Sequence, residues 1–205
     1  KRDPGKNGAL VWADIRIFDS AVVEKMPSTE GDCVDLIRSI SGKYDLDWLL
    51  MASLIYQESQ FKADVVSSKG AFGLIQMMPG TARLFGIDTT STPADQIEAG
   101  IRYLRRLDAE LPKEISDPQE RMKFILAAYN VGIAHVFDAR RLAEKNGMEP
   151  NIWTGIVEYF ILHKSNPDIY QDSVVRYGYA RGNETYNFVR EVLDRYAHYK
   201  NILED

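Results

Sequence analysis

Apolar residues recur at helical spacing over most of the chain from residue 32 onward. In residues 33–44, Val34, Ile37 and Ile40 fall on one stripe, and in residues 92–111 the apolar positions follow one another at intervals of three and four. This period is typical of an amphipathic α-helix, and no convincing run of strict alternation indicates a strand. The pattern predicts an all-α fold of seven to nine helices, with room for a minor β-hairpin in one glycine-rich loop.

Residues 45–59, "DLDWLLMASLIYQES", are apolar nearly all round and follow aspartates suited to capping a helix. Such a helix is usually central and buried. A loop rich in Gly and Ser follows, and Pro79 then opens a short helix. Proline, aspartate and glycine positions delimit the remaining expected helices, which occupy residues 92–111, 117–132, 133–147, 151–164, 168–182 and 183–203.

Residues 1–31 contain Pro4, Gly5, Gly8 and Pro27 and have no sustained period, so they are predicted to be a linker or an N-terminal extension. Residues 32–205 are predicted to form one domain. The first ten residues lack the apolar core of a signal peptide, and no segment has the ~18 apolar residues that a membrane span needs. This pattern fits a cytoplasmic chain, or a mature or trimmed piece of an exported one.

The composition is that of a globular protein, with 45% hydrophobic and 27% charged residues. The formal net charge of -5 argues against nucleic acid as a partner, because such binding requires a basic face. The single cysteine, Cys33, cannot form an internal disulfide and is expected in the core. The three histidines lie far apart and no Cys-x-x-Cys or His-Glu-x-x-His occurs, so no metal or other cofactor is predicted.

Glu58 stands directly after an apolar run, in "LIYQESQF". A carboxyl group at the edge of a core loses hydration, its pKa rises, and it can then serve as a general acid near neutral pH. The alternative is structural: the acid caps a neighbouring helix or pairs with an arginine. Taken alone, Glu58 fits the structural alternative more often than the catalytic one.

Three stretches in order change this balance: "YQESQF" at 56–61, "GAFGLIQMMPGTA" at 70–82 and "AAYNVG" at 127–132. Together they resemble the motifs of the lytic transglycosylase family, in its soluble-lytic-transglycosylase catalytic domain, and the spacing from Glu58 to Gln76 is similar too. The resemblance covers about residues 32–200 and implies a lysozyme-like (goose-type) helical domain. It extends to a membrane-anchored branch of the family, for which residues 1–31 would join an N-terminal solute-binding-like domain absent from this chain.

The resemblance implies a periplasmic, cell-envelope enzyme that acts on peptidoglycan glycan strands. It would cleave the β-1,4 bond between N-acetylmuramic acid and N-acetylglucosamine and leave a 1,6-anhydromuramyl end. Glu58 matches the one glutamate that does this chemistry. Other glycosidases need two carboxylates, whereas Asp64 is the only further acid in the loop after Glu58 and fits a turn better.

The resemblance also assigns substrate-binding residues, each with a structural alternative. Ser67 fits a turn equally well, Gln76 could be a buried structural amide, and Asn130 fits the loop after its helix. Tyr177 and Tyr179 fit a groove wall or plain core. The late motif departs from the family, because "ETYNF" places Phe188 where a tyrosine is usual. The predicted substrate-binding set is Ser67, Gly73, Gln76, Met78, Tyr129 and Asn130.

Two other functions remain open on the sequence. One is a goose-type lysozyme, which hydrolyses the same bond with water. The other is a non-catalytic peptidoglycan-binding module, which the presence of Glu58 disfavours. Analysis of the released products separates all three.

Overall fold

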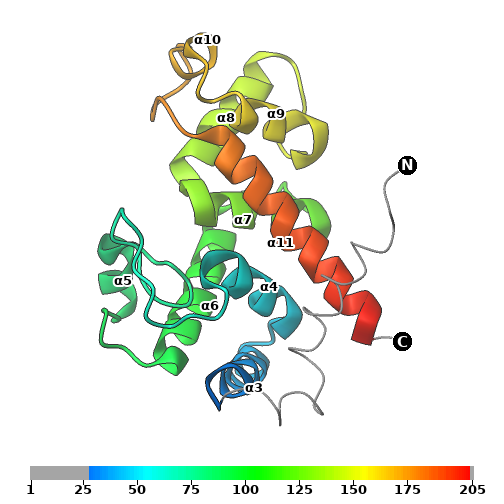
Figure 1. Cartoon of the computed structure of the whole chain (residues 1–205). Helices are drawn as coiled ribbons and strands as arrows, with labels where there is room; N and C mark the ends of the chain where they lie inside the picture. Colours follow the sequence, from blue (N-terminus) through cyan, green and yellow to red (C-terminus); the bar gives the residue numbers. More distant parts are fainter. Residues whose placement is uncertain (1–27, 204–205) are drawn as a thin grey trace, which may run out of the picture. The chain divides into compact units, whose positions relative to one another are not determined.

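The computed structural model describes residues 28–203, and these residues are mostly helical (Figure 1). Isolated antiparallel bridges join Val66 to Phe72 and Phe72 to Met77 where the hairpin was expected, and no strand forms in the described range. The all-α prediction is confirmed. The nine α-helices of this range are α3 (Ser28–Lys43), α4 (Trp48–Ser59), α5 (Pro79–Phe85), α6 (Pro93–Glu110), α7 (Pro118–Val131), α8 (Ile133–Lys145), α9 (Glu158–Leu162), α10 (Pro167–Tyr170) and α11 (Gly182–Leu203).

The described residues separate into two compact units. The first unit contains residues 28–101 and 192–203, and the second contains Arg102–Glu191. Helices α6 and α11 each contribute to both units. The candidate acid Glu58 and the glycine-rich loop belong to the first unit, whereas the Ala-Tyr-Asn motif belongs to the second.

Helix α4 is the buried centre of the first unit, as its apolar sequence predicts. Every residue from Leu49 to Ile55 is buried. The Asp47 side chain caps the helix by accepting a hydrogen bond from the backbone N–H of Leu49, at 3.0 Å. Helix α3 packs against α4 and contributes the predicted apolar stripe, and Cys33 lies in the core beside it.

Residues 62–78, which lie between α4 and α5, are called the glycine loop. Its backbone folds back on itself, because the N–H of Gly73 donates to the carbonyl of Val65 at 2.9 Å. The N–H of Ser67 donates to the carbonyl of Ala71 at 2.8 Å. Pro79 then starts α5, as the sequence indicates, and Gly86 ends that helix in the left-handed conformation.

In the second unit, α7, α8, α9 and the irregular turn η1 (Trp153–Val157) pack together. The ring of Trp153 meets the ring of Phe124 edge to face, with 5.5 Å between centroids. Glu120 of α7 holds the start of η1, because its carboxylate accepts the backbone N–H groups of Trp153 and Thr154. This contact links two segments that are more than thirty residues apart in sequence.

Two of the expected helices are wrong in extent. The segment 151–164 is interrupted, because Gly155 takes a positive φ of 74° that a helix cannot accommodate. In the segment 168–182, only residues 168–170, at the end of α10, and Gly182, at the start of α11, are helical. The backbone there is held by a side chain instead: Asp138 of α8 accepts hydrogen bonds from the N–H groups of Arg176 and Tyr177 at 2.8 and 2.9 Å.

The expected linker, residues 1–31, lies almost wholly outside the described residues. Helix α3 already begins at Ser28, so the expected boundary at residue 32 falls inside a helix. No helix in the described range is long and apolar enough to cross a bilayer. Within the same range, no three His, Cys, Asp or Glu side chains gather as metal ligands would.

Candidate active site

Glu58 occupies the last turn of the buried helix α4, and its side chain is half-buried. Desolvation by burial raises the pKa of this carboxyl from 4.5 to about 8. Among the described residues, neither a hydrogen bond nor an ion pair to the Glu58 carboxyl is found, so the two structural alternatives, a helix cap and an arginine pair, have no support there. A carboxyl that keeps its proton at neutral pH can donate it to a leaving group.

Ser67 and Gln76 lie in the glycine loop that follows Glu58. The Ser67 hydroxyl accepts the N–H of Ala71 at 3.0 Å, so it closes a turn, and its own proton remains free to donate. The Gln76 side-chain nitrogen donates to the carbonyls of Val65 and Gly73 at 3.1 and 2.9 Å. Since both of these acceptors are carbonyls, the amide can take only one orientation, with Nε2 facing them. The oxygen of the Gln76 amide is therefore left to accept a hydrogen bond from a ligand.

Gly73 and Met78 differ in their surroundings. Gly73 is buried with a φ of +75°, and a Cβ at this position would lie 2.2 Å from Oε1 of Gln96. The space beside its α-carbon is thus filled by protein. Met78 precedes α5 and is 47% exposed, so it is not core filler. Neither observation tests the predicted contact of these residues with substrate, which remains a prediction.

Tyr129 and Asn130 lie at the end of α7, in the second unit. The half-buried ring of Tyr129 contacts the rings of Tyr103 and Phe188, with centroids 5.3 and 6.4 Å apart. The amide oxygen of Asn130 accepts a hydrogen bond from the Thr185 hydroxyl at 2.8 Å. Asn130 thereby ties the end of α7 to α11, in agreement with its structural alternative. The two tyrosines with open roles, Tyr177 and Tyr179, are 59% and 55% exposed, so they are not core residues.

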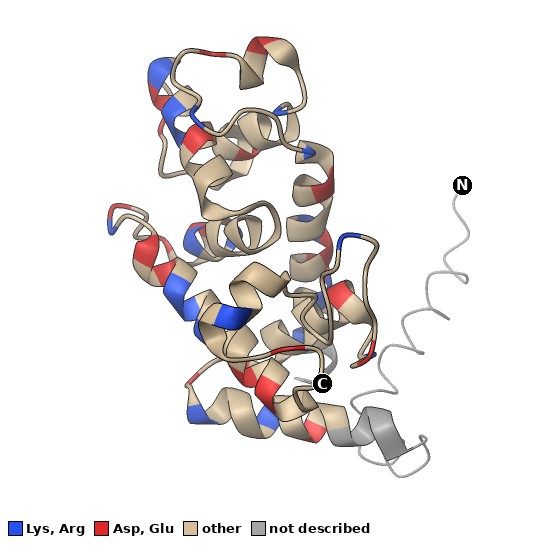
Figure 2. Cartoon of the chain, turned by 90° about the vertical axis from the view of Figure 1, so that its left-hand side faces the viewer, with Lys and Arg blue, Asp and Glu red and all other residues tan. Residues whose placement is uncertain are grey.

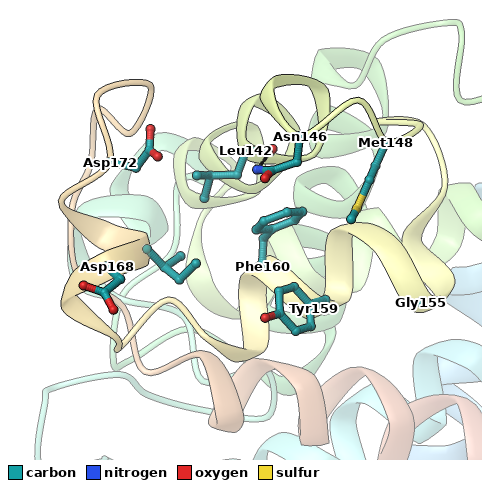
Figure 3. Close-up of a pocket in the computed structure, with 9 residues that line it drawn as sticks. Leu142, Asn146, Met148, Gly155, Tyr159, Phe160, Asp168 and Asp172 are labelled. Carbon is teal, nitrogen blue, oxygen red and sulfur yellow. Dashed lines mark hydrogen bonds between the residues drawn. The ribbon is translucent and has the colours of Figure 1, made fainter.

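A cavity of about 440 Å³ lies elsewhere in the second unit, between α8, α9 and α10 (Figure 3). Figure 3 shows Phe160 at its centre, with Leu142, Asn146 and Tyr159 around it. Asp172 on its wall forms an ion pair with Lys145 at 2.6 Å. None of the predicted site residues lines this cavity. Along the helices in Figure 2, positions of Lys and Arg (blue) are interspersed with positions of Asp and Glu (red).

One residue that the sequence analysis did not single out holds the backbone of the glycine loop from a neighbouring helix. Gln96 of α6 is 3% exposed, and its amide contacts the loop through Leu74 and faces the α-carbon of Gly73. No motif marks it, because its partners in the glycine loop, Leu74 and Ala63, are more than twenty residues away. The only signal in the sequence is a polar residue on the otherwise apolar face of an amphipathic helix, directly before Ile97.

An all-α domain with a desolvated carboxylic acid at the end of its buried helix has the features of the lysozyme-like class. The chain belongs to the transglycosylase SLT domain family, whose model matches residues 35–152. The family predicted from the three motifs is therefore confirmed.

The similarity to known proteins extends over most of the chain. The chain is 35% identical over 192 residues to membrane-bound lytic murein transglycosylase F of Photobacterium profundum. The aligned region covers 94% of this chain and 35% of that protein. The chain is also 41% identical over 151 residues to the protein of the same name from Pseudomonas fluorescens. This aligned region covers 74% of this chain and 30% of that protein. The chain thus spans about a third of the length of the curated relatives it matches.

Among solved structures, the 70 kDa soluble lytic transglycosylase SLT70 from Escherichia coli superposes with a TM-score of 0.52 at 20% identity. The match covers 96% of this chain and 29% of that chain. At this level of identity the superposition shows the fold alone, and the lysozyme-like fold is the one that was predicted.

Proposed function

We propose that this chain is the catalytic domain of a peptidoglycan lytic transglycosylase. It cleaves the β-1,4 bond between N-acetylmuramic acid and N-acetylglucosamine and leaves a 1,6-anhydromuramyl end. The observation that carries the proposal is the Glu58 carboxyl, whose pKa burial raises to about 8 within a domain of the SLT family. Relatives of this chain bear the name lytic murein transglycosylase.

In the proposed reaction, Glu58 first donates its proton to the glycosidic oxygen as the bond to the muramyl C1 breaks. The carboxylate that results then takes the proton of the C6 hydroxyl of the same sugar, whose oxygen attacks C1 and closes the anhydro ring. Glu58 ends the cycle protonated, and no water is consumed. One carboxyl group therefore does the work that two share in other glycosidases.

The surroundings of Glu58 fit a mechanism with a single acid. The nearest acid along the loop, Asp64, is exposed to solvent and so lacks the burial that Glu58 has. In the proposed site, Gln76 accepts a hydrogen bond from the substrate through its free amide oxygen, and Ser67 donates one through its hydroxyl. Gly73, Met78, Tyr129 and Asn130 complete the proposed substrate-binding set.

The proposed place of action is the periplasm, on glycan strands of the cell wall. The relatives are named membrane-bound, and this chain spans about a third of their length. The full-length protein is therefore proposed to be anchored to a membrane. It is also proposed to carry an N-terminal, solute-binding-like domain as a partner of this domain.

The test is mass spectrometry of the muropeptides that the chain releases from purified peptidoglycan, with Glu58→Gln as the matched control. Glutamine keeps the shape of the side chain but cannot deliver a proton, so turnover should fall at least ~100-fold. We expect products lighter than hydrolytic ones by one water molecule, and none from the variant. Reducing ends would establish a lysozyme instead, and glycan binding without any product would establish a binding module.

A further inference from the structure

We propose that Gln96 is a positioning residue for this site: its buried amide fixes the backbone of the glycine loop, and through it the side chain of Gln76. The proposal rests on the proposed function, since it assigns the loop its role in holding a glycan. It concerns a residue that touches neither the acid nor the substrate and acts only through the loop.

The amide of Gln96 contacts the glycine loop at two points, Leu74 and Ala63, and also Ser91, shortly before α6. Its oxygen accepts the N–H of Leu74 at 2.8 Å, and its nitrogen donates to the carbonyl of Ser91 at 3.0 Å and to that of Ala63 at 3.5 Å. Both polar atoms are therefore engaged, and all of these partners are backbone groups. A buried amide with all its bonds made fixes its partners, because releasing any one of them leaves a polar group without water.

Gly73 shows how closely the loop fits this amide. With φ at +75°, its α-carbon faces the Gln96 carboxamide, and an added Cβ would lie 2.2 Å from Oε1 and 2.7 Å from Cδ. Contacts this short do not occur between real atoms, so one of the two must move if residue 73 gains a side chain. The glycine is thus required by Gln96 as well as by its own backbone conformation.

Gly73 in turn fixes the position of Gln76 through two hydrogen bonds. The carbonyl of Gly73 accepts both the backbone N–H of Gln76, at 3.2 Å, and its side-chain nitrogen, at 2.9 Å. Gln76 has a φ of 44°, an unfavourable value for a residue with a side chain, which persists only when the surroundings enforce it. The Gln96 amide supplies that support two residues before Gln76, at Leu74.

A merely structural glutamine would lower stability without changing how the folded enzyme handles its substrate. A positioning residue must also change KM and kcat of the folded fraction, because a shift of about 1 Å in a contact group can cost ~100-fold in rate. The two roles are therefore separated by steady-state kinetics on glycan strands, corrected for the folded fraction by thermal unfolding.

The experiment compares Gln96→Ala and Gln96→Asn with Arg121→Ala. Arg121 provides a matched control, because its guanidinium also ties down backbone carbonyls, those of Pro112 and Ile115 at 2.8 and 3.2 Å, but in the second unit. We expect Gln96→Ala to raise KM at least about fivefold and lower kcat at least about tenfold. Gln96→Asn should recover part of both, and Arg121→Ala should lower stability alone.

A double-mutant cycle with Gly73→Ala tests the contact itself. Gly73→Ala should impair turnover more strongly beside Gln96 than beside Gln96→Ala, since the second change removes the atoms that the new Cβ would strike and leaves only the strain of the positive φ. Additive effects would show that the two residues act independently and would overturn the proposal. So would a Gln96→Ala enzyme with lower stability but unchanged KM and kcat per folded molecule.

Binding separates this proposal from the proposed function. In the Glu58→Gln background, Gln96→Ala should weaken the binding of uncrosslinked glycan strands by at least about fivefold in titration calorimetry. If wild type turns nothing over and this loss of binding is still seen, the proposed reaction fails while the role of Gln96 stands. If the chain neither cleaves nor binds glycan, both proposals are wrong.

Discussion

The ring of Tyr129 lies parallel to the ring of Phe188, with 2° between their planes and 6.4 Å between their centroids. Phe188 is buried, so the stacked pair anchors Tyr129 from α11. In this chain the Phe188 ring supports Tyr129 and offers no hydroxyl of its own to a substrate.

We therefore expect Tyr129→Phe to keep the ring stack while lowering kcat about tenfold, through loss of the hydroxyl that we propose bonds the substrate. Phe188→Leu is the complementary control. It removes the ring contact, worth about 0.5–1.5 kcal/mol, and keeps the Tyr129 hydroxyl. Thermal unfolding and initial rates on glycan strands measure both. A Tyr129→Phe enzyme indistinguishable from wild type would remove this residue from the site.

The raised pKa of Glu58 predicts how activity depends on pH. The proposed general acid must be protonated at the start of the cycle, and burial holds the pKa of Glu58 at about 8. Activity should therefore persist through neutral pH and fall about tenfold per pH unit well above that value. The measurement is kcat/KM against pH on soluble glycan strands. A fall already centred near pH 4.5, the ordinary value for a glutamate, would contradict a desolvated acid.

The same pKa predicts a change in stability that needs no substrate. The folded pKa of Glu58 lies above the unfolded one, so the folded state binds the extra proton. The contribution of Glu58 to stability is then most favourable below about pH 4.5 and declines as pH rises toward 8. Glu58→Gln should match wild type near pH 4 and exceed it by roughly 2–4 kcal/mol at pH 9, in urea unfolding. Equal pH dependence of the two proteins would show that Glu58 is not desolvated.

Periodicity and end signals were enough to predict most helices of this fold. Asp117, Pro118 and Gly132 mark the ends of α7 in the sequence, and the structure starts and stops that helix at these positions. Where a segment is held by a distant side chain, local pattern fails. Residues 171–181 have helix-compatible spacing, yet they form a loop because Asp138, nearly forty residues earlier, accepts their backbone N–H groups.

The same limit applies to the candidate site. Glu58 and the loop residues could be found because the motif residues are contiguous and their chemistry is visible in the sequence. Gln96 could not, since its role depends on backbone groups of Leu74 and Ala63, 22 and 33 residues earlier, that only the fold brings to it. Glu120 is similar: its partners Trp153 and Thr154 follow more than thirty residues later.

The protein is expected to lose the stabilising contribution of Glu120 as the pH becomes acidic. Burial alone would raise the pKa of Glu120, but hydrogen bonds from Lys123, Thr154 and Trp153 outweigh burial and lower the pKa to about 2. Its contribution is therefore present above the unfolded value of 4.5 and is lost as pH falls toward 2. Glu120→Gln should cost about 1–3 kcal/mol at pH 7 and nothing near pH 2, in urea unfolding.

Glu110→Gln is the matched control for Glu120. Glu110 also forms an ion pair, with Arg106 at 2.8 Å, but both side chains are largely exposed, at 40% and 53%. An exposed pair of this kind contributes less than about 0.5 kcal/mol. A control variant as costly as Glu120→Gln would show that the acid effect comes from general charge balance and not from the η1 contact.

The buried pair of Asp138 and Lys164 is expected to determine whether residues 174–181 stay ordered. Both side chains are 0% exposed, and Nζ of Lys164 lies 2.8 Å from the Asp138 carboxylate. Lys164→Met removes the buried cation of that carboxylate and leaves it paired with the partly exposed Arg141, which should cost about 3–5 kcal/mol. Because the same carboxylate accepts the N–H groups of Arg176 and Tyr177, its loss frees their backbone.

Asp138→Ala should therefore accelerate hydrogen exchange at the amides of Arg176 and Tyr177 at least about 100-fold more than it accelerates exchange in α7. Arg140→Ala serves as the control, because Arg140 ties down a different loop through the carbonyl of Pro150 at 3.0 Å. It should leave exchange at residues 176 and 177 unchanged. If Asp138→Ala raised exchange equally throughout the second unit, the carboxylate would be stabilising that unit as a whole and not this segment in particular.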